Sequence, residues 1–355
     1  MIGFYANIDI LAPITMGRLN PSIGQNLSGK QSSIKDLDYY LKGILEERDY
    51  YVLSEAITLL ESSHEEHRQR SLQVLSALYP HRTDAIRLGI TGSPGVGKST
   101  FIDGIAGHYA GSGHTVGILT VDPSSTSGQG SILGDKTRME NLVSHKGIFI
   151  RPSPSNRHLG GLNQYSYESM ILCESAGIDT ILVETVGVGQ SEVEVSSYTD
   201  VMILLILPGS GDSIQGIKKG VLEKADLIVV HKADGDGLNL ANQSIRHLQE
   251  ALHLKKKNST VPEVIAYSSY TYEGQEALLS AIQKVITQKK DSLSAIRNQQ
   301  QNRWLKQRMK DELSYELGKL LDDSQAYQQL LKDPSQNIFE TIQTFKEKIQ
   351  IDLKI

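Results

Sequence analysis

Short runs of consecutive apolar residues alternate with helical patterns between residues 85 and 290. Seven such runs predict strands, at residues 86–91, 115–121, 147–151, 180–186, 201–207, 226–231 and 264–268. Their apolarity is continuous, as in Val201-Met-Ile-Leu-Leu-Ile-Leu207, and continuous apolarity is typical of strands buried on both faces of a parallel sheet. The pattern therefore predicts a three-layer α/β domain with a mainly parallel sheet.

Helical spacing dominates on both sides of this domain. From Ile34 to about Leu78 apolar residues recur every three or four positions, and Pro80 closes the segment. After about residue 291 the strand signals vanish, and polar helices carry an apolar stripe at Leu305, Met309, Leu313, Leu317, Leu320 and Leu321. Such a stripe needs a partner surface. Packing within the chain and a contact between two copies both fit it.

Four segments follow from these patterns. We expect a flexible extension over residues 1–33 and a small helical unit over residues 34–82. The α/β domain should span residues 83–290, and a C-terminal helical arm should span residues 291–355.

Composition narrows the class of protein. The chain has 355 residues, 39% of them hydrophobic, and a formal net charge of -5, which argues against a broad surface for nucleic acid or anionic membranes. A single cysteine, Cys173, excludes an intrachain disulfide and a thiolate metal cluster, so a reducing compartment is expected. Asp9 and Pro13 interrupt the apolar N-terminal residues, so we expect no secretory signal and a cytoplasmic location.

The most specific motif follows the first predicted strand. Residues Gly92-Ser93-Pro94-Gly95-Val96-Gly97-Lys98-Ser99-Thr100 match the phosphate-binding pattern G-x-x-x-x-G-K-[ST], and a helical pattern follows them. The glycines let backbone N–H groups turn toward the phosphates, and the helix that starts near Lys98 directs its positive end at them. Lys98 supplies a cation and Ser99 a hydroxyl for Mg²⁺. The motif therefore predicts a bound nucleoside triphosphate.

Carboxylates stand where this fold binds ligands. Asp122 follows a predicted strand at the carboxyl edge of the sheet and is a candidate for the Mg²⁺ shell. Asp135 lies in a glycine-containing polar run that suits a segment closing over a γ-phosphate and its metal, or a surface turn. Glu184 ends another strand and is a candidate acid that reaches the metal directly or through water. No tightly bound transition metal is expected.

The turn after Glu184 suits a γ-phosphate sensor. The N–H of Gly187 could reach the γ-phosphate, and Gln190 could position the attacking water or serve as a structural amide.

The choice of base depends on the run His231-Lys232-Ala233-Asp234. A carboxylate accepts hydrogen bonds from both donor groups of guanine, whereas adenine presents an acceptor there. Asp234 therefore favours GTP and GDP over ATP. Ser268 and Ser269, after the last strand, are placed to offer a backbone N–H to the guanine carbonyl.

Together these motifs resemble one family of GTPases. The resemblance to the MeaB, MMAA and ArgK family is carried by the phosphate loop and by Asp122-Pro-Ser-Ser125, Ser131-Ile-Leu-Gly-Asp-Lys-Thr-Arg-Met139, Glu184-Thr-Val-Gly-Val-Gly-Gln-Ser-Glu192 and Lys232-Ala-Asp234. It implies a GTPase chaperone that gates cofactor loading and protection of an adenosylcobalamin-dependent methylmalonyl-CoA mutase, with a homodimer built by the C-terminal arm.

The same resemblance implies a switch that couples the nucleotide to the mutase. Its residues correspond to Asp212, Gln215 and Lys218. The chain departs from the family at His231, where the family has Asn, and the imidazole must do what the amide did, such as donating to guanine N7. It also departs over residues 125–130 and 156–158.

Three other functions compete with this hypothesis. Delivery of nickel or zinc is disfavoured, because the ten histidines are scattered and there is one cysteine. An older interpretation of the family is a kinase for a lysine, arginine and ornithine transport system. A scaffold that binds GTP with little turnover is the third.

Overall fold

The computed structural model describes residues 34–122, 142, 145, 147–154, 165–185, 195–209, 219–255 and 261–322. Seven strands form one sheet in the order β3-β2-β4-β1-β5-β6-β7, and all six pairings are parallel. The strands are β1 (Ile86–Gly92), β2 (Val116–Asp122), β3 (Ile148–Pro154), β4 (Thr180–Glu184), β5 (Val201–Ile206), β6 (Leu227–His231) and β7 (Glu263–Tyr267). The predicted parallel α/β fold is confirmed.

Each strand begins within one residue of its predicted start, but two ends differ from the prediction by more than one residue. Strand β3 continues beyond the predicted residue 151 to Pro154, which pairs with Asp122. Prolines are tolerated in β3 because it lies at the edge of the sheet, where one side of the backbone needs no partner. Strand β4 ends at Glu184 rather than at residue 186, so Thr185 already lies outside it.

Helices cover both faces of the sheet. Helix α4 (Lys98–Gly111) contributes Phe101 and Ile105 to a core cluster that also holds Val116 and Ile118 of β2. The position between those two residues is Gly117, where a Cβ would lie 3.7 Å from Cys173 of α7 (Ser166–Ser175). Neighbouring residues of a strand point to opposite faces, so α4 and α7 cover opposite sides of β2.

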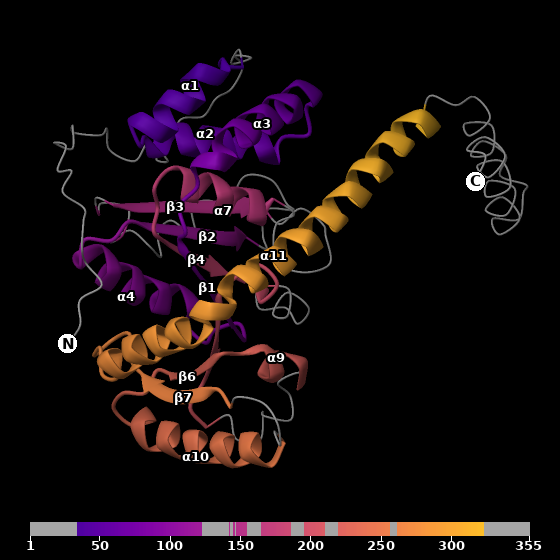
Figure 1. Cartoon of the computed structure of the whole chain (residues 1–355). Coiled ribbons are helices and arrows are strands. Elements are labelled where there is room, and N and C mark those ends of the chain that lie inside the picture. The colour runs from indigo at the N-terminus through magenta and orange to yellow at the C-terminus, as the bar shows by residue number, and fades with distance from the viewer. Residues whose placement is uncertain are drawn as a thin grey trace, which may run out of the picture. The chain divides into compact units, whose positions relative to one another are not determined.

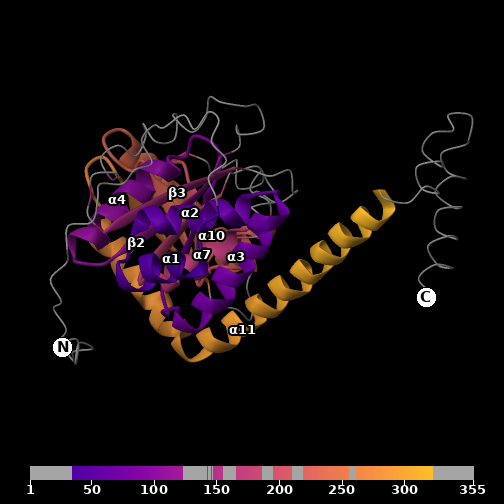
Figure 2. The ribbon, with the colours of Figure 1, turned by 90° about the horizontal axis from the view of Figure 1, so that it is seen from above.

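A group of short helices precedes the sheet in the chain. They are α1 (Leu37–Leu41), a π-helical turn η1 (Lys42–Glu46), α2 (Tyr50–Glu61), α3 (Glu65–Leu78) and a 3₁₀ turn η2 (Tyr79–His81). They gather beyond the β3 edge, while α10 (Gly237–Lys255) lies at the β7 edge (Figures 1 and 2). Every residue of α7 is buried, because α2 and α3 pack on the side of α7 that faces away from the sheet.

The side chain of Arg151 in β3 links this helical group to the edge strand. The guanidinium of Arg151 in β3 donates to the Ser54 hydroxyl at 3.1 Å and to the Thr58 hydroxyl at 3.3 Å, and it forms an ion pair with Glu61. All three partners lie on α2. The helical group is therefore tied to β3 by polar contacts as well as by packing.

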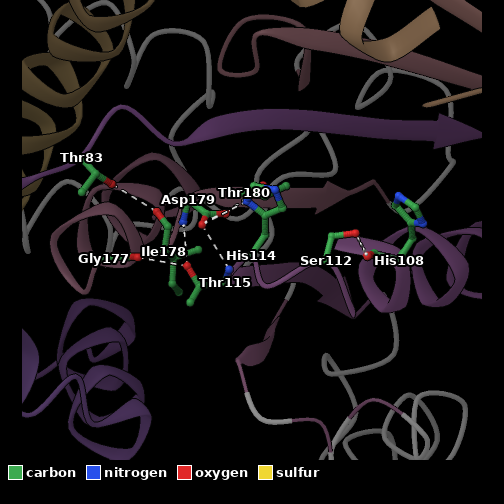
Figure 3. A network of polar contacts seen from close by, with 9 residues as sticks. All are labelled: Thr83, His108, Ser112, His114, Thr115, Gly177, Ile178, Asp179 and Thr180. Atoms are coloured by element: carbon green, nitrogen blue, oxygen red, sulfur yellow. Dashed lines mark hydrogen bonds and ion pairs between the residues drawn. The ribbon is translucent and has the colours of Figure 1, made fainter. Parts of the chain in front are cut away.

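A polar network fixes the amino ends of β2 and β4 (Figure 3). The Asp179 carboxylate accepts the Thr115 N–H at 3.2 Å, and the Asp179 N–H donates to the Thr115 hydroxyl at 3.1 Å. His114 lies 3.5 Å from the same carboxylate, and Thr83 donates to the Ile178 carbonyl. These contacts help to set the register in which Val116 faces Thr180, at the edge opposite the phosphate loop.

The other helices among the described residues are α9 (Lys219–Lys224) and α11 (Gln275–Asp322). The chain divides into two compact units, residues 1–294 and 295–355. Helix α11 begins within the first unit, where Leu278 and Ile282 join the core, and continues without a break into the second. No helix among the described residues combines the length and apolarity that a membrane span requires.

Candidate nucleotide-binding site

The phosphate loop, residues 92–99, joins β1 to α4 at the centre of the sheet. Strand β1 lies between β4 and β5, and the loop leaves its carboxyl end. Gly97 precedes α4 in a left-handed conformation, with φ of 98°, and no side chain caps the helix. A helix start without a side-chain cap suits anion binding, because the first N–H groups of an α-helix have no partner within the helix itself.

Two lysines hold their ammonium groups against carbonyls of this loop. Lys98, which is buried, donates to the Gly92 carbonyl at 3.0 Å, and Lys232 donates to the Gly95 carbonyl at 2.9 Å. Lys232 follows β6 directly and has a φ of 59°, an uncommon conformation for a residue with a side chain. Positive charge thus reaches the loop from α4 and from β6.

Asp234 is held in place by the loop that follows β7. The Ser268 hydroxyl donates a short hydrogen bond to the Asp234 carboxylate, and the same oxygen accepts the N–H groups of Tyr270 at 3.1 Å and Thr271 at 3.2 Å. Ser268 is fully buried. We call residues 268–274 the base loop, because they orient the carboxylate that the sequence assigns to the base.

The two serines of the base loop differ in what they can offer a ligand. The Ser268 N–H is already bonded to the Glu273 carbonyl at 3.0 Å. The Ser269 N–H has no hydrogen-bond partner among the residues that the structure describes. Of the two backbone donors proposed for the guanine carbonyl, the one on Ser269 is therefore available.

His231, the last residue of β6, uses both ring nitrogens within the protein. Its Nδ1 lies 2.8 Å from the Val96 carbonyl oxygen of the phosphate loop, and its Nε2 lies 2.7 Å from the Ser269 hydroxyl. The expected donation from this ring to guanine N7 therefore does not fit the geometry. Burial lowers the pKa of the imidazole below its ordinary value, and the nearby Lys232 acts in the same direction.

The predicted metal ligands are oxygen donors, which suits Mg²⁺. Ser99 lies in the first turn of α4, and Glu184 ends β4 opposite Ile90 of β1. Asp122 ends β2, although its side chain is not described. The described part of this set is therefore compatible with a magnesium ion beside the loop.

Several predicted site residues lie outside the described residues. These are Asp135, Gly187, Gln190, Asp212, Gln215 and Lys218. The remaining loop residues are described: Val96 is buried, while Ser93, Pro94, Gly95 and Thr100 are exposed.

Two contacts next to the site could not be predicted from the sequence. Thr185 donates to Thr91 at 2.9 Å, which joins the carboxyl ends of β4 and β1, and both side chains are buried. Tyr267, the last residue of β7, stacks on the His231 ring with centroids 5.9 Å apart. For both Thr185 and Tyr267, the only indication in the sequence was a position at or next to the end of a predicted strand.

Several known proteins are similar to this chain. A family model described as "Methylmalonyl Co-A mutase-associated GTPase MeaB" matches residues 53–319. The GTPase ArgK of Escherichia coli (strain K12) is 44% identical over 285 residues, covering 79% of this chain and 86% of that protein. The mitochondrial methylmalonic aciduria type A homolog of Mus musculus is 42% identical over 234 residues, covering 62% of this chain and 56% of that protein.

A solved structure is similar over most of the chain. A crystal structure described as an LAO/AO transport system kinase is 33% identical, with a TM-score of 0.68, and covers 90% of this chain and all of that one.

The phosphate loop makes a matched pair of glycine variants informative. Both Gly95 (φ 78°) and Gly97 (φ 98°) are left-handed, so an alanine at either should cost roughly 1–2 kcal/mol of stability. A Cβ on Gly97 would lie 2.7 Å from the His231 ring, whereas one on Gly95 would meet nothing within 4 Å. Gly97→Ala should therefore cost ~1–3 kcal/mol more than Gly95→Ala. Urea unfolding of the two nucleotide-free variants measures this difference, and equal losses would contradict the contact.

Proposed function

Because this chain belongs to the family of methylmalonyl-CoA mutase-associated GTPases called MeaB, we propose a more specific role for its GTPase activity. It is a Mg²⁺-dependent, GTP-hydrolysing chaperone that gates cofactor loading and protection of an adenosylcobalamin-dependent acyl-CoA mutase of the methylmalonyl-CoA type. The observation that best supports binding of a guanine nucleotide is the orientation of the Asp234 carboxylate by Ser268, in a chain that also has a complete phosphate loop.

The site residues divide the work of hydrolysis. The N–H groups at the start of α4 bind the β- and γ-phosphates, and Lys98 exchanges its carbonyl partners for phosphate oxygens. Ser99 and Glu184, with Asp122 and Asp135, hold Mg²⁺, which when bound neutralises charge that develops on the phosphates. The Gly187 N–H contacts the γ-phosphate, and Gln190 orients the water that displaces GDP from it.

Base recognition uses groups from two neighbouring strands. The Asp234 carboxylate follows β6 and accepts from guanine, while the Ser269 N–H follows β7 and donates to the guanine carbonyl. The paired ends of these strands, His231 opposite Tyr267, bring the two groups together.

The coupling to the mutase rests on residues after β5. Asp212, Gln215 and Lys218 form the switch that a partner enzyme reads. Because hydrolysis requires the groups of the proposed switch segments to be placed correctly around the γ-phosphate, turnover should be slow alone and faster with the mutase. The protein acts in the cytoplasm.

The C-terminal arm joins two copies. On α11 the side chains of Leu305, Met309 and Leu313 recur every four residues and are 44%, 64% and 61% exposed. Three large apolar groups on one stripe of a helix favour a covered surface. A second copy of the arm supplies that cover in a homodimer.

One alternative has a specific observation in its favour. The similar solved structure is described as a transport system kinase, so a kinase that transfers the γ-phosphate to a protein is the second candidate. The two functions differ in the phosphate acceptor, which is water in one and a protein side chain in the other.

The choice of base can be tested at Asp234. Asp234→Asn replaces an acceptor of two hydrogen bonds by a group that presents its own donors to guanine, so GTP affinity should fall about 10- to 1000-fold. Asp236, exposed and two residues later, provides the matched control Asp236→Asn. Calorimetric titration with GTP and ATP measures both effects. Wild-type protein that binds ATP as tightly as GTP, or a D234N variant that keeps its preference, would contradict the assignment.

The partner can be tested by turnover. Phosphate release from GTP should be slow and should rise at least about tenfold when a purified adenosylcobalamin-dependent acyl-CoA mutase is added. Lys98→Ala should abolish both rates, because the loop then lacks its phosphate cation. A mutase that leaves the rate unchanged, with no capture by the protein loaded with a nonhydrolysable GTP analogue, would contradict the role. Label from γ-labelled GTP on a protein would favour the kinase.

The dimer can be tested by mass in solution. Light scattering should give the mass of two chains for the wild type and of one chain for Leu313→Glu, because a charge within an apolar contact is costly to bury. The control Leu72→Glu changes a leucine of α3 that is 51% exposed, and it should leave the dimer intact. A monomeric wild type would favour packing of the stripe within one chain.

A further inference from the structure

The His231 imidazole is held rigidly between aromatic rings. It is 2% exposed, it stacks on Tyr267 of β7 at an interplanar angle of 25°, and it meets the edge of Phe101 of α4 at 89°. The ring also lies so close to Gly97 that a Cβ there would be 2.7 Å from its Cε1 atom. Contacts from β7, α4 and the phosphate loop therefore restrict the position of the ring.

The hydrogen bonds of this ring determine its tautomer. The Val96 carbonyl carries no proton, so the ring must donate to it from Nδ1–H at 2.8 Å. In a neutral imidazole Nε2 then carries a lone pair, which accepts the proton of the Ser269 hydroxyl at 2.7 Å. Burial and the Lys232 charge favour the neutral ring, whereas the bond to Val96 and the Asp234 charge act in the opposite direction.

We infer that His231 is a positioning residue: as the neutral Nδ1–H tautomer it joins the phosphate loop to the base loop and sets the place of Ser269. The inference rests on the proposed nucleotide-binding function. Val96 belongs to the loop that binds the phosphates, and Ser269 belongs to the loop that faces the base. One side chain therefore ties together the protein groups at the two ends of the nucleotide.

In this arrangement the hydroxyl and the backbone N–H of Ser269 serve two different purposes. Its hydroxyl proton is used by the imidazole, while its N–H has no partner among the described residues and stays available for the guanine carbonyl. Loss of the ring should therefore affect guanine binding through Ser269, although the ring itself does not touch the base. Asp234 is oriented separately, by Ser268.

Two substitutions separate the halves of the bridge. The amide of Asn places a donor near the position of Nδ1, so His231→Asn keeps the bond to Val96 and loses the one to Ser269. The longer side chain of His231→Gln places an acceptor near Nε2, so this variant keeps the bond to Ser269 and loses the one to Val96. Each should weaken GDP binding about 5- to 30-fold, the effect of one buried hydrogen bond.

Ser269→Ala should weaken GDP binding by the same factor as His231→Asn, because both remove the bond between the ring and the Ser269 hydroxyl. The double variant His231→Asn with Ser269→Ala should therefore bind GDP no more weakly than either single variant. Thr287→Ala is the control: it removes an exposed hydroxyl of α11 that donates to the Gln283 carbonyl, outside the base loop and the phosphate loop, and should change GDP affinity less than about twofold. Wild-type affinity in both His231→Asn and His231→Gln, or additive losses in the double variant, would overturn the inference.

The tautomer provides a measurement that needs no variant and no nucleotide. Nitrogen NMR of the labelled imidazole in wild-type protein at neutral pH should show a protonated Nδ1 and an unprotonated Nε2 for His231. A protonated Nε2, whether in the other tautomer or in a cationic ring, would overturn the inference. If the wild type binds no guanine nucleotide, the proposed function fails, while the NMR result still tests the bridge.

Discussion

The parallel register of neighbouring strands is the constraint on which the site depends. Parallel strands end at the same edge of a sheet, so β4, β1, β5, β6 and β7 deliver their following residues side by side. Ile90 faces Glu184, and His231 faces Tyr267, which places the loop that binds phosphate, a candidate metal ligand and both base-recognition segments along one edge. Residues about 170 positions apart in the chain, such as Val96 and Ser269, thereby meet at the same side chain.

Much of this edge could be predicted, because its signals are local. Continuous apolar runs placed every strand start within one residue, and glycines with a lysine identified the phosphate loop. The end of β3 was predicted too early: an edge position tolerates prolines, so the strand continues to Pro154. The partners of His231 could not be predicted, since they depend on contacts between segments distant in the sequence and on which way a ring points.

The two ammonium groups beside the phosphate loop both have hydrogen-bond partners within the protein. Lys98 and Lys232 each donate to a loop carbonyl, at 3.0 and 2.9 Å, so their ammonium groups keep hydrogen bonds while they face the region assigned to the phosphates. An ammonium bonded to a phosphate gains an attraction between opposite charges that an ammonium bonded to a neutral carbonyl lacks. Exchange of a carbonyl for a phosphate oxygen is therefore favourable and requires only a side-chain movement. The backbone of the loop can already have its binding conformation, which lowers the cost of ordering it.

The position of β1 explains how a change at the γ-phosphate could reach a partner protein. Strand β1 carries the phosphate loop, and its two neighbours in the sheet are β4 and β5. The chain that follows β4 contains Gly187 and Gln190, and the chain that follows β5 contains Asp212, Gln215 and Lys218. Both proposed switch segments therefore start one strand away from the loop, on either side of it. The buried hydrogen bond between Thr185 and Thr91 joins the end of β4 to β1. A movement of the segment that follows β4 would therefore begin next to a residue that is held in place. A signal along this route needs no rearrangement of the sheet, because the segments that would move begin where the strands end.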